Sequence, residues 1–405
     1  MQSTIQFYPA SAPTAAVRDI QLNALPPLSL YVHIPWCVRK CPYCDFNSHE
    51  LAKASDDWET SYVNALIADL ESVLPQVWGR RLSSIFIGGG TPSLLSERAM
   101  DTLLAGIRAR LPQISEMEIT MEANPGTLEV GKLRGFREAG VTRVSLGVQS
   151  FDDELLRRIG RIHSADQAKY ALEQAYALFP KVNLDLMFAL PQQSMAQLQA
   201  DVATALSFAP THMSYYHMTI EPNTLFHRHP PIVPDDELAL DMQDFIQSEL
   251  AAQGLHHYEV SAYAQPNHEC QHNTNYWQFG DYIGIGAGAH GKISQHDRIV
   301  RTARFKHPQR YLDAVAQGNA VETEQYLTRS ELPFEYMLNA LRLREGTTRA
   351  QMQMACGLSV VDLEPALSQA QAKGLMVKDA DVLRVTDLGW RFLSDVQAMF
   401  LQDAD

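Results

Sequence analysis

The chain has 405 residues, of which 46% are hydrophobic and five are cysteines, and its formal net charge is −14. This length provides ample material for a buried core in two or three domains. The acidic balance disfavours nucleic acid and anionic membrane surfaces as general partners. No apolar run reaches the roughly 18 residues that a membrane-spanning helix needs.

Residues 1–27 open the chain and are rich in Ala, Pro, Ser and Thr. They lack the basic start and apolar segment of a signal peptide. This composition predicts a loosely ordered N-terminal arm.

Three cysteines, Cys37, Cys41 and Cys44, follow the first predicted strand (residues 28–34) with the spacing C-x3-C-x2-C. Three thiolates on one short loop can bind three irons of a [4Fe–4S] cluster and leave the fourth iron open. This arrangement resembles the radical S-adenosylmethionine (SAM) superfamily. There the open iron binds the amino and carboxylate groups of SAM, and an electron from the cluster breaks a carbon–sulfur bond to give a 5′-deoxyadenosyl radical.

Two other uses of these cysteines were weighed. A zinc site wants four ligands, and Cys270, His33 or His272 could supply the fourth. A disulfide framework is disfavoured because the cysteines are sparse and odd in number. The ligand count favours the cluster, and reduced thiols beside a reducible cluster predict a cytoplasmic location.

Short β-rich runs alternate with amphipathic stretches in the first half of the chain. This repetition favours a parallel sheet with helices outside it, in six units that form an open or closed barrel. Ligands in such folds bind at the carboxyl ends of the strands. Strands are predicted at 28–34, 83–87, 118–123, 143–149, 181–187 and 212–219, and helices at 56–74, 97–111, 129–139, 165–179 and 195–208.

Polar or glycine-rich residues stand at these strand ends. Gly88-Gly-Gly-Thr-Pro-Ser follows the second strand, where backbone can approach a ligand closely, although a tight turn is an equal alternative. Glu122 ends the third strand, and a charge there is costly unless paired, either with a SAM amino group or ribose hydroxyl or in a salt bridge. Gln149 ends the fourth strand and Asp185 lies in the fifth, and each could bind ribose or adenine or satisfy a neighbouring strand. Arg161 could fix a ligand carboxylate.

The last part of the chain predicts a separate small domain. Helices at 333–343, 349–355 and 360–372, followed by a hairpin at 374–385, resemble a winged helix. Residues 331–400 carry nine acidic and seven basic residues. We therefore expect this domain to contact protein or cover a ligand rather than bind DNA.

A set of motifs resembles the HemN/HemW branch of radical SAM proteins: Tyr31-Val-His-Ile-Pro-Trp-Cys, Gly88-Gly-Gly-Thr-Pro, Glu122-Ala-Asn-Pro, Ser145-Leu-Gly-Val-Gln-Ser-Phe, Gly160-Arg-Ile-His and Asn183-Leu-Asp-Leu-Met. The match covers nearly the whole chain from about residue 29. The resemblance implies an α/β fold, with a partial (β/α)6 barrel and a small helical, winged-helix-like C-terminal domain. It places the cluster on Cys37, Cys41 and Cys44, a first SAM on Tyr31, Gly90 and Glu122, and a second SAM site on Tyr43, Thr91, Pro92, Gln149, Arg161 and Asp185.

Two functions compete within this branch. HemN proteins are oxygen-independent coproporphyrinogen III dehydrogenases, whereas HemW proteins resemble heme chaperones. The dehydrogenases carry a further cysteine two residues after the third, where this chain has Phe46, and a longer N-terminal extension. The H-N-x-x-Y-W signature of the HemW branch matches His272, Asn273, Tyr276 and Trp277.

A heme-related role for that signature has a physical basis. His272 could offer an imidazole nitrogen to heme iron, and Tyr276 and Trp277 offer flat faces for a porphyrin. Without the resemblance, packing of these aromatic residues at the barrel mouth would be the favoured interpretation. His217, His290 and Cys270 are weaker candidates for the axial ligand.

The sequence thus predicts a heme chaperone that binds a [4Fe–4S] cluster, SAM and heme and delivers heme to acceptor hemoproteins. The alternative is a coproporphyrinogen III dehydrogenase. The resemblance suggests a membrane-bound respiratory hemoprotein as acceptor, which leaves a peripheral position at the membrane open, as it leaves a homodimer open. The expected domains are an arm (1–27), a barrel (28–255), a connecting region (256–330) and a C-terminal domain (331–405).

Overall fold

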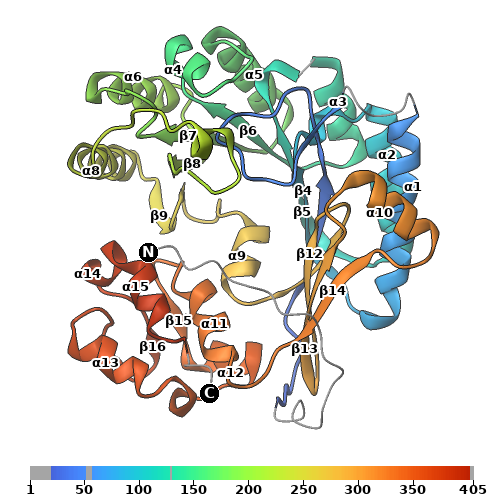
Figure 1. Cartoon of the computed structure of the whole chain (residues 1–405), viewed down its shortest axis with the longest axis vertical. Helices are drawn as coiled ribbons and strands as arrows, with labels where there is room; N and C mark the ends of the chain where they lie inside the picture. Colours follow the sequence, from blue (N-terminus) through green and yellow to red (C-terminus); the bar gives the residue numbers. More distant parts are fainter. Residues whose placement is uncertain (1–19, 52–56, 128–129, 402–405) are drawn as a thin grey trace.

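The computed structural model describes residues 20–51, 57–127 and 130–401 (Figure 1). All six predicted strands lie side by side and parallel in one sheet. In spatial order they are β1 (Leu28–Ile34), β4 (Leu82–Gly89), β5 (Gln113–Ala123), β6 (Arg143–Gln149), β7 (Lys181–Phe188) and β8 (His212–His217).

The sheet continues beyond the six predicted strands at both ends. Beside β1 lies a further parallel strand, β11 (Asp281–Ile285), and then the antiparallel strands β12 (His290–Gln295), β13 (Arg298–Arg304) and β14 (Val321–Tyr326). Beside β8 lie the antiparallel strands β10 (Ala262–Ala264) and β9 (His256–Glu259). In the described residues β14 and β9 end the sheet and do not pair with each other, so the predicted partial barrel is confirmed in its open form.

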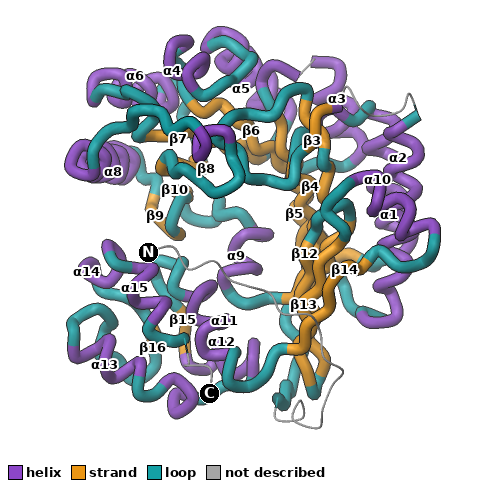
Figure 2. Tube along the Cα trace, in the orientation of Figure 1, coloured by secondary structure: helices purple, strands orange, loops and turns teal. Residues whose placement is uncertain are grey.

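Helices cover the outer face of this curved sheet, as Figures 1 and 2 show. Side chains cap several of them: the hydroxyls of Ser164 and Ser194 accept from backbone N–H groups three residues on, and each forms a reciprocal capping box. The helices of this part of the chain are α1 (Trp58–Val73), α2 (Glu97–Arg110), α3 (Val130–Ala139), α4 (Asp153–Arg158), α5 (Ala165–Leu178), α6 (Met195–Leu206), α7 (Leu225–Arg228), α8 (Asp236–Ala252), α9 (Gln271–Trp277) and α10 (Pro308–Ala316), with 3-10 turns η3 (Leu74–Gln76), η4 (Pro92–Leu94) and η5 (Pro125–Thr127). Among them α9 does not cover the outer face but lies on the inner side of the sheet, where its residues line the interior cavities.

Burial along β1 identifies the face that carries the site. Six of its seven residues are buried, as expected for a parallel strand covered on both sides. The exception is Tyr31, which is half-buried and lines the interior cavities described below. The cysteine loop follows this strand and is closed by a short parallel pair, β2 (Trp36–Cys37) and β3 (His49–Glu50).

The C-terminal domain has its own apolar core and packs beside α9 and β13 (Figure 1). The predicted helix at 360–372 is interrupted at Pro365. The predicted hairpin at 374–385 is confirmed in a short form: its two arms pair at the Met376–Val385 bridge, where the Val377 N–H donates to the Arg384 carbonyl and the Thr386 N–H to the Leu375 carbonyl. Its second arm also contains β16, which pairs with the unpredicted strand β15. The elements are α11 (Leu332–Ala340), β15 (Thr347–Thr348), α12 (Arg349–Cys356), η6 (Val360–Leu363), α13 (Ala366–Ala372), β16 (Val382–Leu383), and the unpredicted α14 (Asp387–Arg391) and α15 (Leu393–Ala398).

The predicted N-terminal arm lies partly outside the described residues, which begin at 20. Its described end is not loose: Ile20 and Leu22 are buried in the core of the C-terminal domain. The Leu22 N–H donates to the His296 carbonyl at 2.9 Å. Burial of two large aliphatic side chains outweighs the polar composition from which the arm was predicted.

Candidate functional site

A cavity of about 730 Å³ opens at the carboxyl ends of the parallel strands, and we call it the cluster cavity. Of the predicted site residues it is lined by Cys37, Cys41, Cys44, Tyr31, Tyr43, Gly90, Thr91, Glu122, Gln149, Arg161, Asp185, His272, Asn273, Tyr276 and Trp277. Pro92 is the exception, because it is buried at the start of η4 and is not among the lining residues.

The three cysteines of the loop are free, half-buried and face this cavity. The Cys44 N–H donates to the Cys41 carbonyl, which closes a tight turn, and a guanidinium nitrogen of Arg161 lies 3.7 Å from the Cys41 sulfur. Among the described residues no three His, Cys, Asp or Glu side chains converge on a single ion, as a zinc site requires. A [4Fe–4S] cluster binds each thiolate to a separate iron, so the loop fits a cluster.

Burial raises the pKa of the Cys37 and Cys44 thiols. A nearby cation or metal has the opposite effect on a thiol. Iron must therefore displace protons from these cysteines when a cluster assembles on the loop.

The carboxyl of Glu122 lies inside the cluster cavity. One of its oxygens accepts the Gly89 N–H at 3.0 Å, and no Lys, Arg or His of the described residues forms an ion pair with it. Burial, together with the charge of Asp185, raises the pKa of Glu122 to about 8. A carboxylate held without a cation suits the ammonium group of a ligand.

The glycines of the Gly88-Gly-Gly segment allow three close approaches. A Cβ at Gly88 would lie 2.9 Å from a Glu122 oxygen, and one at Gly89 would lie within 3 Å of the His33 ring. At Gly90 it would lie 2.5 Å from the Trp36 carbonyl oxygen, and the Gly90 N–H donates to Ile34. These contacts leave no room for side chains, so the glycines serve for more than a tight turn: they let the backbone lie close against the first strand and Glu122.

Arg161 crosses the opposite side of the cluster cavity. It donates to the Asn124 side-chain oxygen at 2.5 Å and to the Gly147 carbonyl at 2.6 Å, while its Nε is buried without a hydrogen-bond partner in the described residues. Asn124 in turn donates to the hydroxyl of Thr91. A buried guanidinium with a free donor suits a carboxylate or another acceptor of a ligand.

Asp185 is held by short hydrogen bonds from the Ser145 hydroxyl (2.7 Å) and the Asn183 amide (2.8 Å), and burial raises its pKa. Gln149 takes a left-handed backbone conformation at the end of β6 (φ 68°). This turn places it at the end of the strand among the residues that line the cavity. The structure thus brings together at one cavity residues from five different strand ends, as the sequence predicted.

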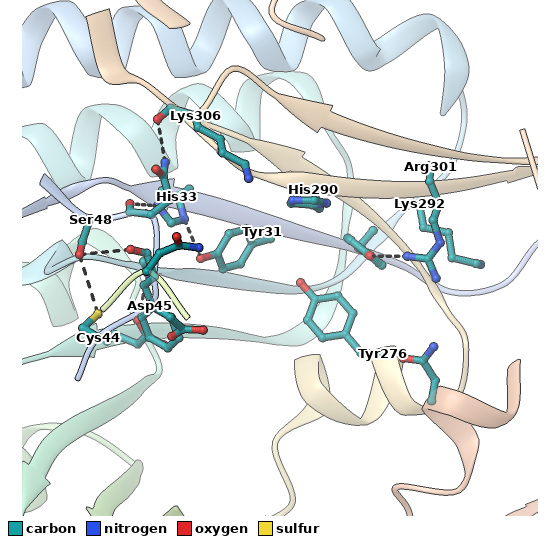
Figure 3. A pocket seen from close by; sticks show the side chains of 18 of the residues that line it. Tyr31, His33, Cys44, Asp45, Ser48, Tyr276, His290, Lys292, Arg301 and Lys306 are labelled. Atoms are coloured by element: carbon teal, nitrogen blue, oxygen red, sulfur yellow. Dashed lines mark hydrogen bonds between the residues drawn. The ribbon is translucent and has the colours of Figure 1, made fainter. Parts of the chain in front are cut away.

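A second cavity of about 750 Å³ adjoins the first, and we call it the basic cavity (Figure 3). Four cationic side chains and two carboxylates line it, although the chain as a whole is acidic. The cations are Lys40, Lys292, Arg301 and Lys306, and the histidines are His33, His49 and His290. The wall shared with the cluster cavity is formed by Tyr31, Cys44, Asp45, Phe46, Ser48, Gly89, Glu122, Tyr276 and Trp277.

Asn47 connects the cysteine loop to the basic cavity. Its side-chain nitrogen donates to the Ala287 carbonyl at 2.9 Å and to the Lys306 carbonyl at 2.8 Å. Its own carbonyl is hydrogen-bonded to the His33 ring at 2.9 Å, and the other His33 nitrogen to the Tyr31 hydroxyl. Because burial lowers the pKa of His33 to about 4, this ring is neutral at pH 7. The sequence prediction missed the bridging role of Asn47, since carbonyl partners far along the chain leave no signal in a motif.

The predicted signature residues lie on α9, between the two cavities. His272 is buried, with its Nδ1 3.0 Å from the Ser84 hydroxyl and its Nε2 2.9 Å from the Tyr276 hydroxyl. Burial lowers its pKa to about 3. His272 could bind iron only by giving up one of these hydrogen bonds, whereas Tyr276 and Trp277 line both cavities directly.

Comparisons with known proteins show the family of this chain and its fold. The Radical SAM superfamily model matches residues 31–205, and the HemN C-terminal domain model matches residues 327–392. The heme chaperone HemW of Escherichia coli (strain K12) is 47% identical over 94% of this chain and 99% of its own length. The chain belongs to the HemW family. HemW of Haemophilus influenzae is 42% identical and that of Bacillus subtilis 35% identical, over 94% and 92% of this chain and 99% of each relative.

The fold of this HemW family member is also that of a solved relative. The structure of Escherichia coli coproporphyrinogen III oxidase (HemN), a radical SAM enzyme, superposes with a TM-score of 0.80 at 22% identity and covers 98% of both chains. This likeness confirms the predicted radical SAM fold. None of the helices in the described part of the chain has the length and apolar character needed to cross a bilayer.

Proposed function

We propose that this HemW family member binds a [4Fe–4S] cluster, SAM and heme, and delivers heme to acceptor hemoproteins in the cytoplasm. The observation that carries this proposal is the position of α9, whose Tyr276 and Trp277 form the wall between the cluster cavity and a second cavity large enough for a cofactor. Cofactor sites of about 300–1,000 Å³ are typical.

The cluster cavity suits the [4Fe–4S] cluster and the methionine part of SAM. Cys37, Cys41 and Cys44 would hold the cluster, which when bound supplies an open iron and an electron for SAM. Glu122 offers a carboxylate to the SAM ammonium, because no protein cation pairs with it. Arg161 lines the same cavity and offers its positive charge to a carboxylate of SAM.

The remaining polar residues suit the nucleoside part of SAM. Asp185, Gln149 and Thr91 line the same cavity and carry acceptors and donors of the kind that ribose and adenine need. Tyr43 also lines this cavity and packs against an apolar cluster that includes Leu155 and Ile159. The cavity has room for SAM beside the cluster loop, and a second SAM remains part of this proposal.

The proposed binding of heme is based on Tyr276 and Trp277, the aromatic residues of α9 between the two cavities. Tyr276 and Trp277 line both cavities, and aromatic rings there suit contact with a porphyrin, while Asn273 lines the cluster cavity beside them. We retain His272 as a residue that positions Tyr276 through its hydrogen bond.

A paired assay tests the proposal. The cluster is reconstituted anaerobically, and one sample receives SAM, a reductant and coproporphyrinogen III while the other receives hemin and then an apo-hemoprotein. We expect no multiple-turnover decarboxylation, together with a heme spectrum that moves from this chain to the acceptor. Sustained formation of the decarboxylated product would replace the chaperone function with that of a dehydrogenase.

A further inference from the structure

The floor of the basic cavity is one face of the antiparallel extension of the sheet. His290 and Lys292 are two residues apart on β12, so their side chains share a face. Lys292 is directly opposite Arg301 on β13 and opposite Tyr282 on β11. Figure 3 shows His290, Lys292 and Arg301 along this floor, with Tyr276 facing them from α9.

Like charges directly opposite each other on neighbouring strands are unfavourable unless they are compensated. Lys292 is buried and paired with Asp281 at 2.9 Å. Arg301 is paired with Glu335, yet its Nε remains buried without a hydrogen-bond partner in the described residues. The indole N–H of Trp277, in the facing wall, is also buried without a partner. The cavity is thus lined by more cations than carboxylates, which suits a ligand that carries carboxylates of its own.

His290 and Lys306 line this cavity with side chains that are available to bind a ligand. In the described part of the chain the His290 ring has no hydrogen-bond partner and the Lys306 ammonium has no ion pair, and both residues are exposed. Although His290 is accessible from the cavity, the protein around its ring partly desolvates it, and this desolvation, followed by the charges of Lys306 and Arg301, lowers its pKa, so the imidazole is mainly neutral at pH 7. A neutral imidazole with a free nitrogen is a ligand for iron.

We propose that the basic cavity is the heme site, where His290 binds the iron while Lys306 and Arg301 hold the porphyrin carboxylates. This assignment rests on the proposed function. The ligand class is an iron porphyrin with free carboxylates, lying between Tyr276 and the sheet face. His272 does not bind the iron, because its two nitrogens are occupied by Ser84 and Tyr276.

The backbone around His290 supports a fixed position for the ring. A Cβ at Gly284 would lie 1.8 Å from the His290 carbonyl oxygen, so only glycine allows β11 to approach this residue. The Ala289 carbonyl accepts the Arg304 N–H at 2.8 Å, and Asn47 binds both the Ala287 and Lys306 carbonyls. The Asn47 side chain thus connects the cysteine loop to Lys306 and to the segment that precedes the strand of His290.

Hemin titration of the full-length, cluster-reconstituted protein tests the iron ligand. We expect His290→Ala to weaken hemin binding by at least about tenfold, to change the magnetic circular dichroism of the heme, and to leave the affinity for metal-free protoporphyrin IX unchanged. The matched control is His227→Ala, which removes an exposed histidine of α7 that lines neither cavity. His290→Cys keeps a ligand of another kind and should shift the spectrum to that of a thiolate-bound heme.

Lys306→Gln tests the carboxylate contact. Because the amine is exposed, we expect a loss of hemin affinity of about threefold to tenfold, and no loss for hemin dimethyl ester, whose carboxylates are blocked. The assignment is overturned if His290→Ala and His290→Cys keep the wild-type heme spectrum and affinity. A wild-type protein that binds no hemin at all would instead overturn the proposed function itself.

Discussion

The two cavities share a wall but differ in charge and in origin. The cluster cavity lies at the ends of parallel strands and contains the carboxyls of Glu122 and Asp185. The basic cavity lies on the face of the antiparallel strands β12 and β13 and is lined mainly by cations. The cluster cavity is lined by both carboxyls and arginines, whereas cations predominate in the basic cavity. Adjoining sites of different charge can select two different ligands, such as SAM in the first and a porphyrin with carboxylates in the second.

The largest expected effect is on the cluster itself. Cys41→Ser removes a thiolate that lines only the cluster cavity, so we expect the protein to lose its cluster, measured as iron and sulfide content after anaerobic reconstitution. Cys356→Ala is the matched control, because Cys356 is a free cysteine buried in the C-terminal domain. Equal cluster content in Cys41→Ser and wild type would remove Cys41 from the ligand set.

Glu122→Gln should change SAM affinity and apoprotein stability in opposite directions. The variant cannot pair with the SAM ammonium, so we expect SAM affinity to fall by about tenfold or more. In the wild-type apoprotein the folded pKa of about 8 lies above the usual value of 4.5, so stability present at low pH is lost as the pH rises from 4.5 through 8.

The glutamine variant lacks this pH dependence. Relative to wild type it should therefore gain about 3 kcal/mol between pH 5 and pH 8, measured by urea unfolding. Asp201→Asn alters a buried carboxyl that is satisfied by Ser150 and Phe151, and it should leave SAM affinity unchanged. If Glu122→Gln binds SAM as tightly as wild type does, the Glu122 carboxyl does not contact SAM.

Asn47→Ala should loosen the connection between the two cavities. The substitution leaves the carbonyls of Ala287 and Lys306 without their donor, which costs about 1–3 kcal/mol. We expect a lower free energy of unfolding and a several-fold weaker affinity for hemin, whereas Asn319→Ala, at an exposed position on the turn after α10, should change neither. If Asn47→Ala lowers stability but keeps hemin affinity, the bridge serves the fold alone.

His272→Ala should have the smallest effect. Loss of its hydrogen bond frees the Tyr276 hydroxyl, so we expect hemin binding to weaken by about threefold while the cluster spectrum and the heme ligation signature stay unchanged. A changed ligation signature would make His272 the iron ligand in place of His290. Unchanged affinity would remove His272 from the heme site.

Much of the fold could be predicted from the sequence because its signals are local. Each parallel strand is a short apolar run between turn residues, and the helices have caps such as Ser164 and Ser194. The strand ends of a parallel sheet meet at one edge, so chain order alone predicted that Glu122 and Gln149 lie at one site, and both line the cluster cavity.

The basic cavity could not be predicted in this way. Arg301 and Lys306 belong to no motif, and they reach His290 only through cross-strand register and the approach of β11 at Gly284. In the C-terminal domain, the pairing of residues 382–383 with residues 347–348 could not be predicted for a related reason, since the two segments lie far apart in the chain. The pairing register of strands that lie far apart in the chain depends on the tertiary fold, so no local sequence pattern predicts it.

The central claim is that SAM and heme occupy different cavities, and one measurement tests it most directly. The affinity of the cluster-reconstituted protein for SAM is measured by equilibrium dialysis with and without saturating hemin. Separate cavities predict that SAM still binds to the hemin-loaded protein, with an affinity within a few-fold of that of the free protein. Stoichiometric displacement of SAM by hemin would contradict the account and place both ligands in the cluster cavity.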